Sequence, residues 1–498
     1  MGNIRKQSLF SSGIIFIGFL VGALNTYLFT KGDGFTLEEY GLTRIFFDMG
    51  QTFFAIASLG VIPVIYKFFP YFKYNLPDHE NDLLTWCLLA GLIGFVLLLG
   101  GGILMEPLIV RKFIGRSPLI VEYYYWIFPF TFFLLFYSIL ECYTWQLKKT
   151  IFPNFLRETG LRLLTTVIIA LKISHIISYD TFVKLFSLLF GAILVALIVY
   201  MIRLKSFHFT FRISRVSRKF FKKMFTLVFL TYSGVIITVL AQTLDGIFIA
   251  SFQGLADAGI FTLATYITSL IMIPQRGLQP ISIPVLSKAW KDKNMGEIDR
   301  IYRRSSINLL AIGLFLFLNI WLNMADAIIF FGLKPEFLLG MTAVLVMGIS
   351  KLIDLGTGVN NLIITTSIYW RFEFYSGVFL LGISIPANYF LIKHYGITGA
   401  AFSNLISLTL YNAVRIYFLW YKYRLQPFSP KTVYVVLLAV CCYALAYFPF
   451  RGISGFGIMI LRSLIFTVPF IAGVFYFHIT PDAWQFWNKV KENLGISK

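Results

Sequence analysis

The sequence has little charge. Asp, Glu, Lys and Arg make up 13% of the 498 residues, whereas an ordinary soluble domain carries about 25%. It also lacks any long polar stretch that could fold as a soluble domain, because apolar segments follow one another along the chain. These two absences exclude a soluble enzyme and assign the function to a membrane.

Residues typical of cofactor chemistry are also scarce. The four Cys lie inside or at the edges of apolar segments, where they form neither a disulfide framework nor a zinc-ligand pattern, and there are only five His. The nucleotide-binding pattern G-x-x-x-x-G-K-[ST] does not occur. We therefore expect no metal site, no cofactor, no enzymatic activity and no ATP hydrolysis by this chain.

Apolar residues are abundant, at 58% of the sequence. They form continuous runs of about 20 residues, the length of a membrane-spanning helix, rather than the short alternating segments of a barrel. The sequence predicts an all-α polytopic membrane protein with about fourteen transmembrane helices. The expected spans are 9–29, 44–66, 83–105, 119–140, 159–177, 182–202, 225–250, 259–286, 305–325, 339–368, 372–393, 397–421, 432–449 and 458–478.

The net charge of +20 comes mainly from loops on one side of the expected membrane. The stretches 203–223 and 288–304 hold the densest groups of Lys and Arg. Because cytoplasmic loops carry an excess of these residues, both termini are expected in the cytoplasm. We interpret the two basic stretches as surfaces for anionic membrane lipids, not for nucleic acid.

Three short motifs recur in the same order in the two parts of the chain. They are Ser12-Gly13-Ile14-Ile15 with Ser233-Gly234-Val235-Ile236, Tyr40-Gly41-Leu42 with Ala258-Gly259-Ile260, and Pro63-Val64-Ile65 with Pro284-Val285-Leu286. With six spans in each copy, they indicate a parallel repeat, although chance similarity of short apolar motifs is the alternative. The predicted domains are an N-terminal lobe (1–205), a basic linker (206–224), a C-terminal lobe (225–424) and two extra helices with a tail (425–498).

Charged residues inside the spans cost at least about 2.5–3.5 kcal/mol each to insert, so each needs an explanation. Arg276 is the best single candidate for ligand binding, because it lies within a span that Pro274, Pro280 and Pro284 should bend. A guanidinium group offers a planar pair of donors that suits phosphate oxygens. Arg276 is therefore predicted to bind a phosphate group.

Lys351 and Asp354 lie three residues apart near the middle of one span and share a helix face. Two interpretations stay open: the two charges neutralise each other, or both line a cavity. Arg44 opens span two, where it can pair with Asp48 or lie at the membrane interface. Asp245, near the end of span seven, is a buried carboxylate that needs a partner.

Other charged residues suggest structural roles. Glu141, at the end of span four, and Arg162, near the start of span five, are expected to form a structural ion pair, with Glu158 sharing the cation. Four cations near span ends are interpreted as anchors that reach toward the headgroups. They are Arg415, Arg462, Lys172 and Lys184.

Three longer motifs stand out between residues 243 and 401. They are Thr243-Leu244-Asp245-Gly246-Ile247-Phe248-Ile249-Ala250 with Gly254 and Ala258-Gly259-Ile260-Phe261, Tyr395-Gly396-Ile397-Thr398-Gly399-Ala400-Ala401, and Thr357-Gly358-Val359-Asn360-Asn361 through Tyr369-Trp370-Arg371-Phe372-Glu373. These motifs resemble those of the Wzx-type polysaccharide and O-antigen flippases, and the third resembles the version found in Bacteroidetes-like members. In one departure, Gly246 stands where many members have Lys or Arg, so any role of that charge is absent or has moved.

The resemblance implies the multidrug/oligosaccharidyl-lipid/polysaccharide exporter superfamily, with two lobes around a central cavity and alternating access. It also implies a flippase for undecaprenyl-pyrophosphate-linked oligosaccharide in the bacterial inner membrane, with polysaccharide assembly proteins as partners. Arg276, Lys351 and Arg44 would then bind the pyrophosphate, while Asp245 or Asp354 would couple transport to an ion gradient.

Three alternatives stay open. A multidrug and toxin cation antiporter of the same superfamily would have an acidic cavity, which the surplus of cations within the spans disfavours. A lipid II flippase would share the features described above. A membrane polysaccharide polymerase, which belongs to another class, usually needs a large external loop that the expected spans do not leave.

Overall fold

The computed structural model describes residues 17–32, 34–204 and 208–480. Within these ranges all the regular elements are helices. Nine of these helices are long and apolar enough to cross a membrane, or up to eleven if each of two bent pairs counts as one span. The predicted all-α, multi-pass membrane fold is confirmed.

Each of the fourteen expected spans overlaps a helical segment of the described residues, although residues 9–16, and with them the motif Ser12–Ile15, lie outside that part. The structure has fewer candidate spans than the fourteen expected, for three local reasons. The first span is described only as the short helix Ile17–Thr30. A five-residue π turn, Leu156–Gly160, overlaps the start of the fifth span, and the helix that follows it, α8 (Leu161–Ile173), has only 13 residues. Two expected spans form the single element α16 (Arg371–Tyr423), kinked at Gly396.

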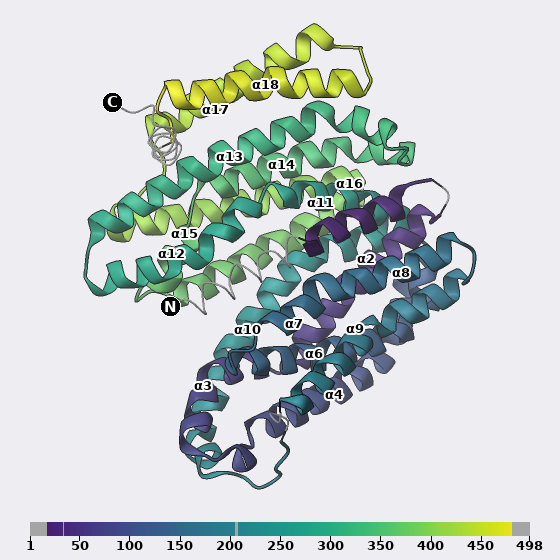
Figure 1. Cartoon of the computed structure of the whole chain (residues 1–498), viewed down its shortest axis with the longest axis vertical. Coiled ribbons are helices and arrows are strands. Elements are labelled where there is room, and N and C mark those ends of the chain that lie inside the picture. Colours follow the sequence, from purple (N-terminus) through teal and green to yellow (C-terminus); the bar gives the residue numbers. More distant parts are fainter. Residues whose placement is uncertain (1–16, 33, 205–207, 481–498) are drawn as a thin grey trace. The chain divides into compact units, whose positions relative to one another are not determined.

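The chain forms two compact units, Met1–Gly259 and Ile260–Lys498. The predicted lobes and linker stay a prediction. In the first unit, α6 packs against both α9 and α2, around a group of aromatic side chains that includes Phe130 stacked on Phe186. The main helices of this unit are α2 (Leu37–Ala57), α3 (Val61–Asn75), α4 (Leu83–Phe113), α6 (Ile127–Gln146), α8, α9 (Tyr179–Arg203) and α10 (Arg215–Phe252), several of which are labelled in Figure 1.

A sharp bend separates α2 from α3. The two helices meet at 51°, and Leu59 and Gly60 at the break both have positive φ angles. Such a break frees backbone carbonyls that a membrane span must satisfy internally. The hydroxyl of Tyr232 on α10 donates to the carbonyl of Ile56 at 2.5 Å, so α10 completes the hydrogen bonding of the bend.

The second unit contains a helical hairpin that packs on a third helix. Figure 1 shows α17 and α18 in yellow, side by side, and both contact α13. Their shared core includes Ala439, Phe466 and Phe470. The elements of this unit are the end of α11 (Leu255–Leu270), α12 (Ile273–Lys291), α13 (Met295–Phe330), α14 (Met341–Gly356), α15 (Asn360–Thr366), α16, α17 (Pro430–Tyr447) and α18 (Phe456–Tyr476).

The predicted bend in the eighth span is confirmed. The chain turns by 52° between Leu255–Leu270 and Ile273–Gln279, and Pro274 occupies the first turn of α12. Proline is tolerated there because the first N–H groups of a helix have no partner within it. The bend therefore places Arg276 in the first turn of a new helix.

The span expected at 339–368 is broken, which the sequence did not predict. α14 ends at Gly356 and α15 begins at Asn360. Gly358 has a φ of 64° and lies so close to α13 that a Cβ would be 2.7 Å from Ser305 Oγ. Hydroxyl groups of α13 satisfy the break: Ser306 Oγ donates to the carbonyl of Gly356 at 2.5 Å. The break creates a short irregular backbone segment within an apolar span.

Gly41 and Gly259 occupy equivalent positions in the repeat motifs. Each lies against the first residue of the helix that carries the other. A Cβ on Gly41 would meet the carbonyl of Leu255, and a Cβ on Gly259 would lie 2.5 Å from the carbonyl of Leu37. Leu37 and Leu255 each precede their glycine by four residues. Such a reciprocal contact is what two copies of one motif make when they face each other. The parallel repeat itself stays a prediction.

Candidate functional site

Two of the predicted phosphate ligands have no charge partner. Arg276, on α12, has an exposed side chain, and Lys351, on α14, is half-buried. In the part of the chain that the structure describes, neither forms an ion pair, and Lys351 does not pair with Asp354 three residues away. Mutual neutralisation of Lys351 and Asp354 is therefore wrong, and both cations are available to an anionic ligand.

Asp354 instead belongs to a buried polar cluster around the break between α14 and α15. Asn412 Nδ2 donates to Asp354 Oδ1 at 2.9 Å, and Asn412 Oδ1 accepts from Asn360 Nδ2 at 2.9 Å. Thr357, which lies in the break itself, donates to the carbonyl of Asp354 at 2.7 Å. The cluster orients the Asp354 carboxylate through neutral groups and leaves its charge uncompensated.

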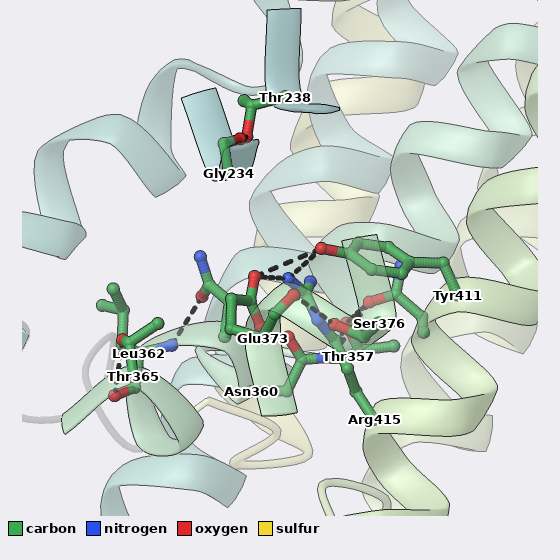
Figure 2. A network of polar contacts seen from close by, with 12 residues as sticks. Gly234, Thr238, Thr357, Asn360, Leu362, Thr365, Glu373, Ser376, Tyr411 and Arg415 are labelled. Carbon is green, nitrogen blue, oxygen red and sulfur yellow. Dashed lines mark hydrogen bonds and ion pairs between the residues drawn. The ribbon is translucent and has the colours of Figure 1, made fainter. Parts of the chain in front are cut away.

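An ion pair lies beside this cluster, between the two ends of α16. Figure 2 shows Glu373 with Tyr411 and Arg415, next to Thr357 and Asn360. Arg415 Nη2 and the Tyr411 hydroxyl both donate to Glu373 Oε1, and the guanidinium carbon lies 3.8 Å from the centre of the Tyr411 ring. Arg415 is buried, so its interpretation as a headgroup anchor is wrong.

The first unit contains a second polar cluster, between α2 and α10. Arg44 Nε lies 3.0 Å from Asp48 Oδ2, which confirms the pairing that their spacing allows. Thr52, one turn further along α2, shares a hydrogen bond of 2.9 Å with Thr243 of α10. The Asp48 carboxylate is buried, whereas a third of the Arg44 side chain is exposed. Arg44 is therefore already charge-compensated, unlike Arg276 and Lys351.

Asp245 belongs to the same cluster. Its charge is close enough to Asp48 to repel it, and the next residue, Gly246, lies against the Asp48 carboxylate with no space for a side chain. Arg44 of α2 supplies the positive charge next to Asp48.

The ion pair predicted between Glu141 and Arg162 does not form. Glu141 pairs with Arg157, and Arg162 pairs with Glu158 at 3.3 Å, as their spacing of four allows. The reason is the π turn Leu156–Gly160, which precedes Arg162 and changes the helical register. It places Arg157 against the end of α6.

Arg462 and Lys172 are also not simple anchors. Arg462 is buried, lies 2.5 Å from Asp326 and donates to the carbonyls of Phe450 and Ile453. Lys172 lies 3.1 Å from Glu39. The exposed pair of Lys184 with Asp180 is the one that fits a position near the membrane surface. The first two cations fix loops and helix ends within the fold.

Sequence reasoning missed the partners of these charges. Asn360, Asn412 and Thr357 are uncharged, so a search for ionisable residues passes over them, although each is a buried polar group within an apolar span. The described residues contain no group of His, Cys, Asp or Glu able to hold a metal ion. Chemically, the arrangement offers two cations without an ion-pair partner among the described residues, Arg276 and Lys351, and one carboxylate held by a neutral amide, Asp354.

No family model matches the sequence, and no curated protein matches it. The fold does match solved structures. A lipid II flippase, MurJ, in an inward closed conformation has a TM-score of 0.74 at 14% identity, covering 94% of this chain and 99% of that one. An inward-facing multidrug resistance MATE family transporter of the MOP superfamily has a TM-score of 0.61 at 15% identity, covering 84% and 97%.

A third structure, of a MOP superfamily transporter from Pyrococcus furiosus, has a TM-score of 0.53 at 14% identity and covers 84% of this chain and 95% of that one. At these identities the likeness shows the fold. The chain therefore shares the fold of these transporter structures over most of its length.

Proposed function

We propose that this chain is a flippase of the bacterial inner membrane, with both termini in the cytoplasm. It moves an oligosaccharide linked to undecaprenyl pyrophosphate from one leaflet to the other by alternating access. The fold supports this proposal through its likeness to a lipid II flippase over nearly the whole of both chains. The Wzx-type motifs favour a polysaccharide precursor as the cargo.

The observation that carries the proposal is the lack of charge partners for Arg276 and Lys351 in the described structure. A cation within a span is costly, and one that no carboxylate neutralises is expected to serve a ligand. A pyrophosphate supplies several oxygen acceptors, and the Arg276 guanidinium can donate to two of them at once. Arg44, by contrast, already shares its charge with Asp48.

Coupling to an ion gradient is assigned to the carboxylates. Asp354 is held by the Asn412 amide and by no cation, so a proton or a metal cation can exchange there without breaking an ion pair. Asp245 lies beside Asp48 in the first unit and is the second candidate. Polysaccharide assembly proteins would receive the cargo after translocation.

The decisive experiment measures the leaflet distribution of lipid-linked oligosaccharide in cells with and without this chain. We expect the cargo to accumulate on the cytoplasmic leaflet in its absence. Arg276→Ala should lower the translocation rate by about tenfold or more, because a hydrogen bond to a charged group is worth about 1.5–3 kcal/mol. Arg276→Lys should keep part of the rate, because it keeps the charge but loses the paired donors.

Lys184→Ala is the matched control. Lys184 is exposed and paired with Asp180, so its loss should leave translocation unchanged. An Arg276→Ala protein that folds and translocates at the normal rate would remove the centre of the proposal.

A cation antiporter of the same superfamily is the second candidate. The multidrug transporter among the structural neighbours favours it, as do the buried Asp48 and its neighbour Asp245. It predicts altered drug tolerance and an unchanged leaflet distribution when the chain is lost. In that case Asp354→Asn should abolish drug efflux, whereas Arg276→Ala should not. A polysaccharide polymerase, the alternative from another class, has no observation in its favour.

A further inference from the structure

A cavity of about 800 Å³ lies within the first unit, between α3, α4 and α10, directly after the bend that joins α2 to α3. This volume is within the range of about 300–1,000 Å³ that is typical of ligand sites. The walls are almost entirely apolar; representative lining residues are Val64 and Phe72 of α3, Trp86 and Cys87 of α4, and Phe225 and Val228 of α10. We call this cavity the α3–α4–α10 groove.

The apolar walls determine which part of a ligand fits inside. A polar group placed there would lose its hydrogen bonds to water without replacement, so the enclosed part must be hydrocarbon. The apolar surface continues outward along α10, where Phe221 and Phe225 are 66% and 68% exposed. The groove is thus open along a strip that a flexible hydrocarbon chain can follow.

Cations gather at one end of the groove. Arg218 is the one charged residue among its lining residues, and Arg215 and Lys222, three and four residues away on α10, lie on the same helix face. All three side chains are exposed, and within the described residues none has an ion-pair partner. This end of the groove therefore suits a phosphate group.

The backbone at this end is fixed by a buried carboxylate. Asp82 Oδ2 accepts hydrogen bonds from Ser217 Oγ at 2.7 Å and from the backbone N–H of Ser214 at 2.9 Å. It also accepts from the indole N–H of Trp86 at 3.1 Å. Asp82 thus ties the start of α10 to α4 and orients a side chain that lines the groove. The cationic end and the apolar wall are held in one arrangement before any ligand binds.

We propose that the α3–α4–α10 groove binds one anionic phospholipid, with an acyl chain along its apolar walls and the phosphate on Arg218, Arg215 and Lys222. An apolar tail joined to an anionic head is the ligand chemistry that these walls and this charge match together, and a bilayer supplies it directly. The proposal concerns a resident lipid rather than a cargo, so it stands whether or not the chain is a flippase.

Trp86 provides a probe for the test. Phosphatidylglycerol with a dibrominated acyl chain is added to the full-length protein in neutral detergent, and tryptophan quenching is recorded. The difference between the natural protein and Trp86→Phe isolates the signal from the groove. We expect that signal to saturate. Arg218→Ala combined with Lys222→Ala should raise the half-saturating lipid fraction by about tenfold.

Lys219→Ala combined with Lys223→Ala is the matched control, because it removes the same charge from the same helix. Both ammonium groups lie 5.8 Å from the Phe220 ring rather than along the groove. A change of less than about twofold is expected, as for ordinary surface substitutions. Equal losses in the two double variants would show attraction to a basic surface alone and overturn the proposal.

Three further results would overturn it. Ala90→Phe fills the groove without changing any charge, so undiminished binding by this variant would place the acyl chain elsewhere. Dibrominated phosphatidylcholine that quenches at the same lipid fraction as phosphatidylglycerol would remove the role of the cations. Displacement of the lipid by a polyprenyl phosphate at a much lower fraction would assign the groove to a prenyl chain instead. Thermal unfolding of each variant confirms that it is folded.

Discussion

Gly246 of α10 lies directly against the carboxylate of Asp48 on α2, and any side chain at position 246 would displace it. The same carboxylate holds Arg44 at 3.0 Å. Three residues on two helices therefore form one packed unit. A glycine here avoids a clash with the buried Asp48 carboxylate.

We predict that Gly246→Ala destabilises the protein. The added methyl group must push the Asp48 carboxylate away from Arg44, and overpacking of this kind costs about 1–3 kcal/mol. Thermal unfolding in detergent measures the change. Gly234→Ala, on the same helix, is the control, because a Cβ there meets no atom within 4 Å. It should leave stability unchanged or raise it by up to about 1 kcal/mol. Equal effects at the two positions would contradict the packing of Gly246 on Asp48.

The pairing of Glu141 leads to a second prediction. Its side chain is 3% exposed and Arg157 is its partner, so Arg157→Met should leave a buried carboxylate without compensation and cost about 3–5 kcal/mol. Arg162→Met should cost only about 0.3–0.5 kcal/mol, because Arg162 and Glu158 form a half-exposed pair within one helix. Unfolding of the two variants under identical conditions measures the difference. A larger loss of stability in Arg162→Met than in Arg157→Met would instead support the ion pair of Glu141 with Arg162 that the sequence predicts.

The length of the apolar runs predicts the helices of this chain, but it does not predict where a helix is interrupted. Runs of about 20 apolar residues fix the helices, because an unpaired backbone group is too costly in lipid. The prolines around Arg276 predicted the bend between α11 and α12. No pattern in the sequence predicted the π turn before Arg162 or the break at Gly358. Both depend on backbone contacts with other helices, such as the approach of Gly358 to Ser305.

Charge partners were the least predictable feature. Pairs four residues apart, such as Arg44 with Asp48, follow from helix geometry alone. Partners on different helices, such as Asn412 for Asp354 or Asp326 for Arg462, depend on how the helices pack. Nearness to a span end made Arg415 look like an anchor, although the fold buries it against Glu373.

A third prediction concerns Asp354. Asp354→Asn keeps an oxygen that accepts from Asn412 but removes the charge, so the protein should unfold within a few degrees of the natural one. Transport driven by an ion gradient should be lost, while exchange of cargo without a gradient should persist. Rates measured in vesicles with and without a proton or sodium gradient test this.

Asn412→Ala is the companion variant. It removes the donor to Asp354 and the acceptor for Asn360, so it should cost about 1–3 kcal/mol in stability. If Asp354→Asn still transported cargo at the full gradient-driven rate, Asp354 would be excluded from coupling and Asp245 would be left as the candidate.

The pair of Glu373 with Arg415 gives a fourth prediction, for stability rather than transport. Removing one partner leaves a desolvated charge, so Arg415→Met and Glu373→Gln should each destabilise the protein, with a loss of about 3–5 kcal/mol expected for Arg415→Met. The pair itself is poorly satisfied, because Glu373 Oε2 and Arg415 Nε are buried without a hydrogen-bond partner. The double variant should therefore be more stable than Arg415→Met alone.

A double-mutant cycle on thermal unfolding measures this coupling, which should be at least about 1 kcal/mol for residues in direct contact. The half-exposed pair of Asp299 with Arg303, 2.8 Å apart on α13, is the matched control and should show about 0–1 kcal/mol. Additive effects of the two substitutions at Glu373 and Arg415 would mean that the pair does not hold the ends of α16 together. The buried position of Arg415 would then have to be stabilised by its contact with the Tyr411 ring, and Tyr411→Leu would become the more damaging change.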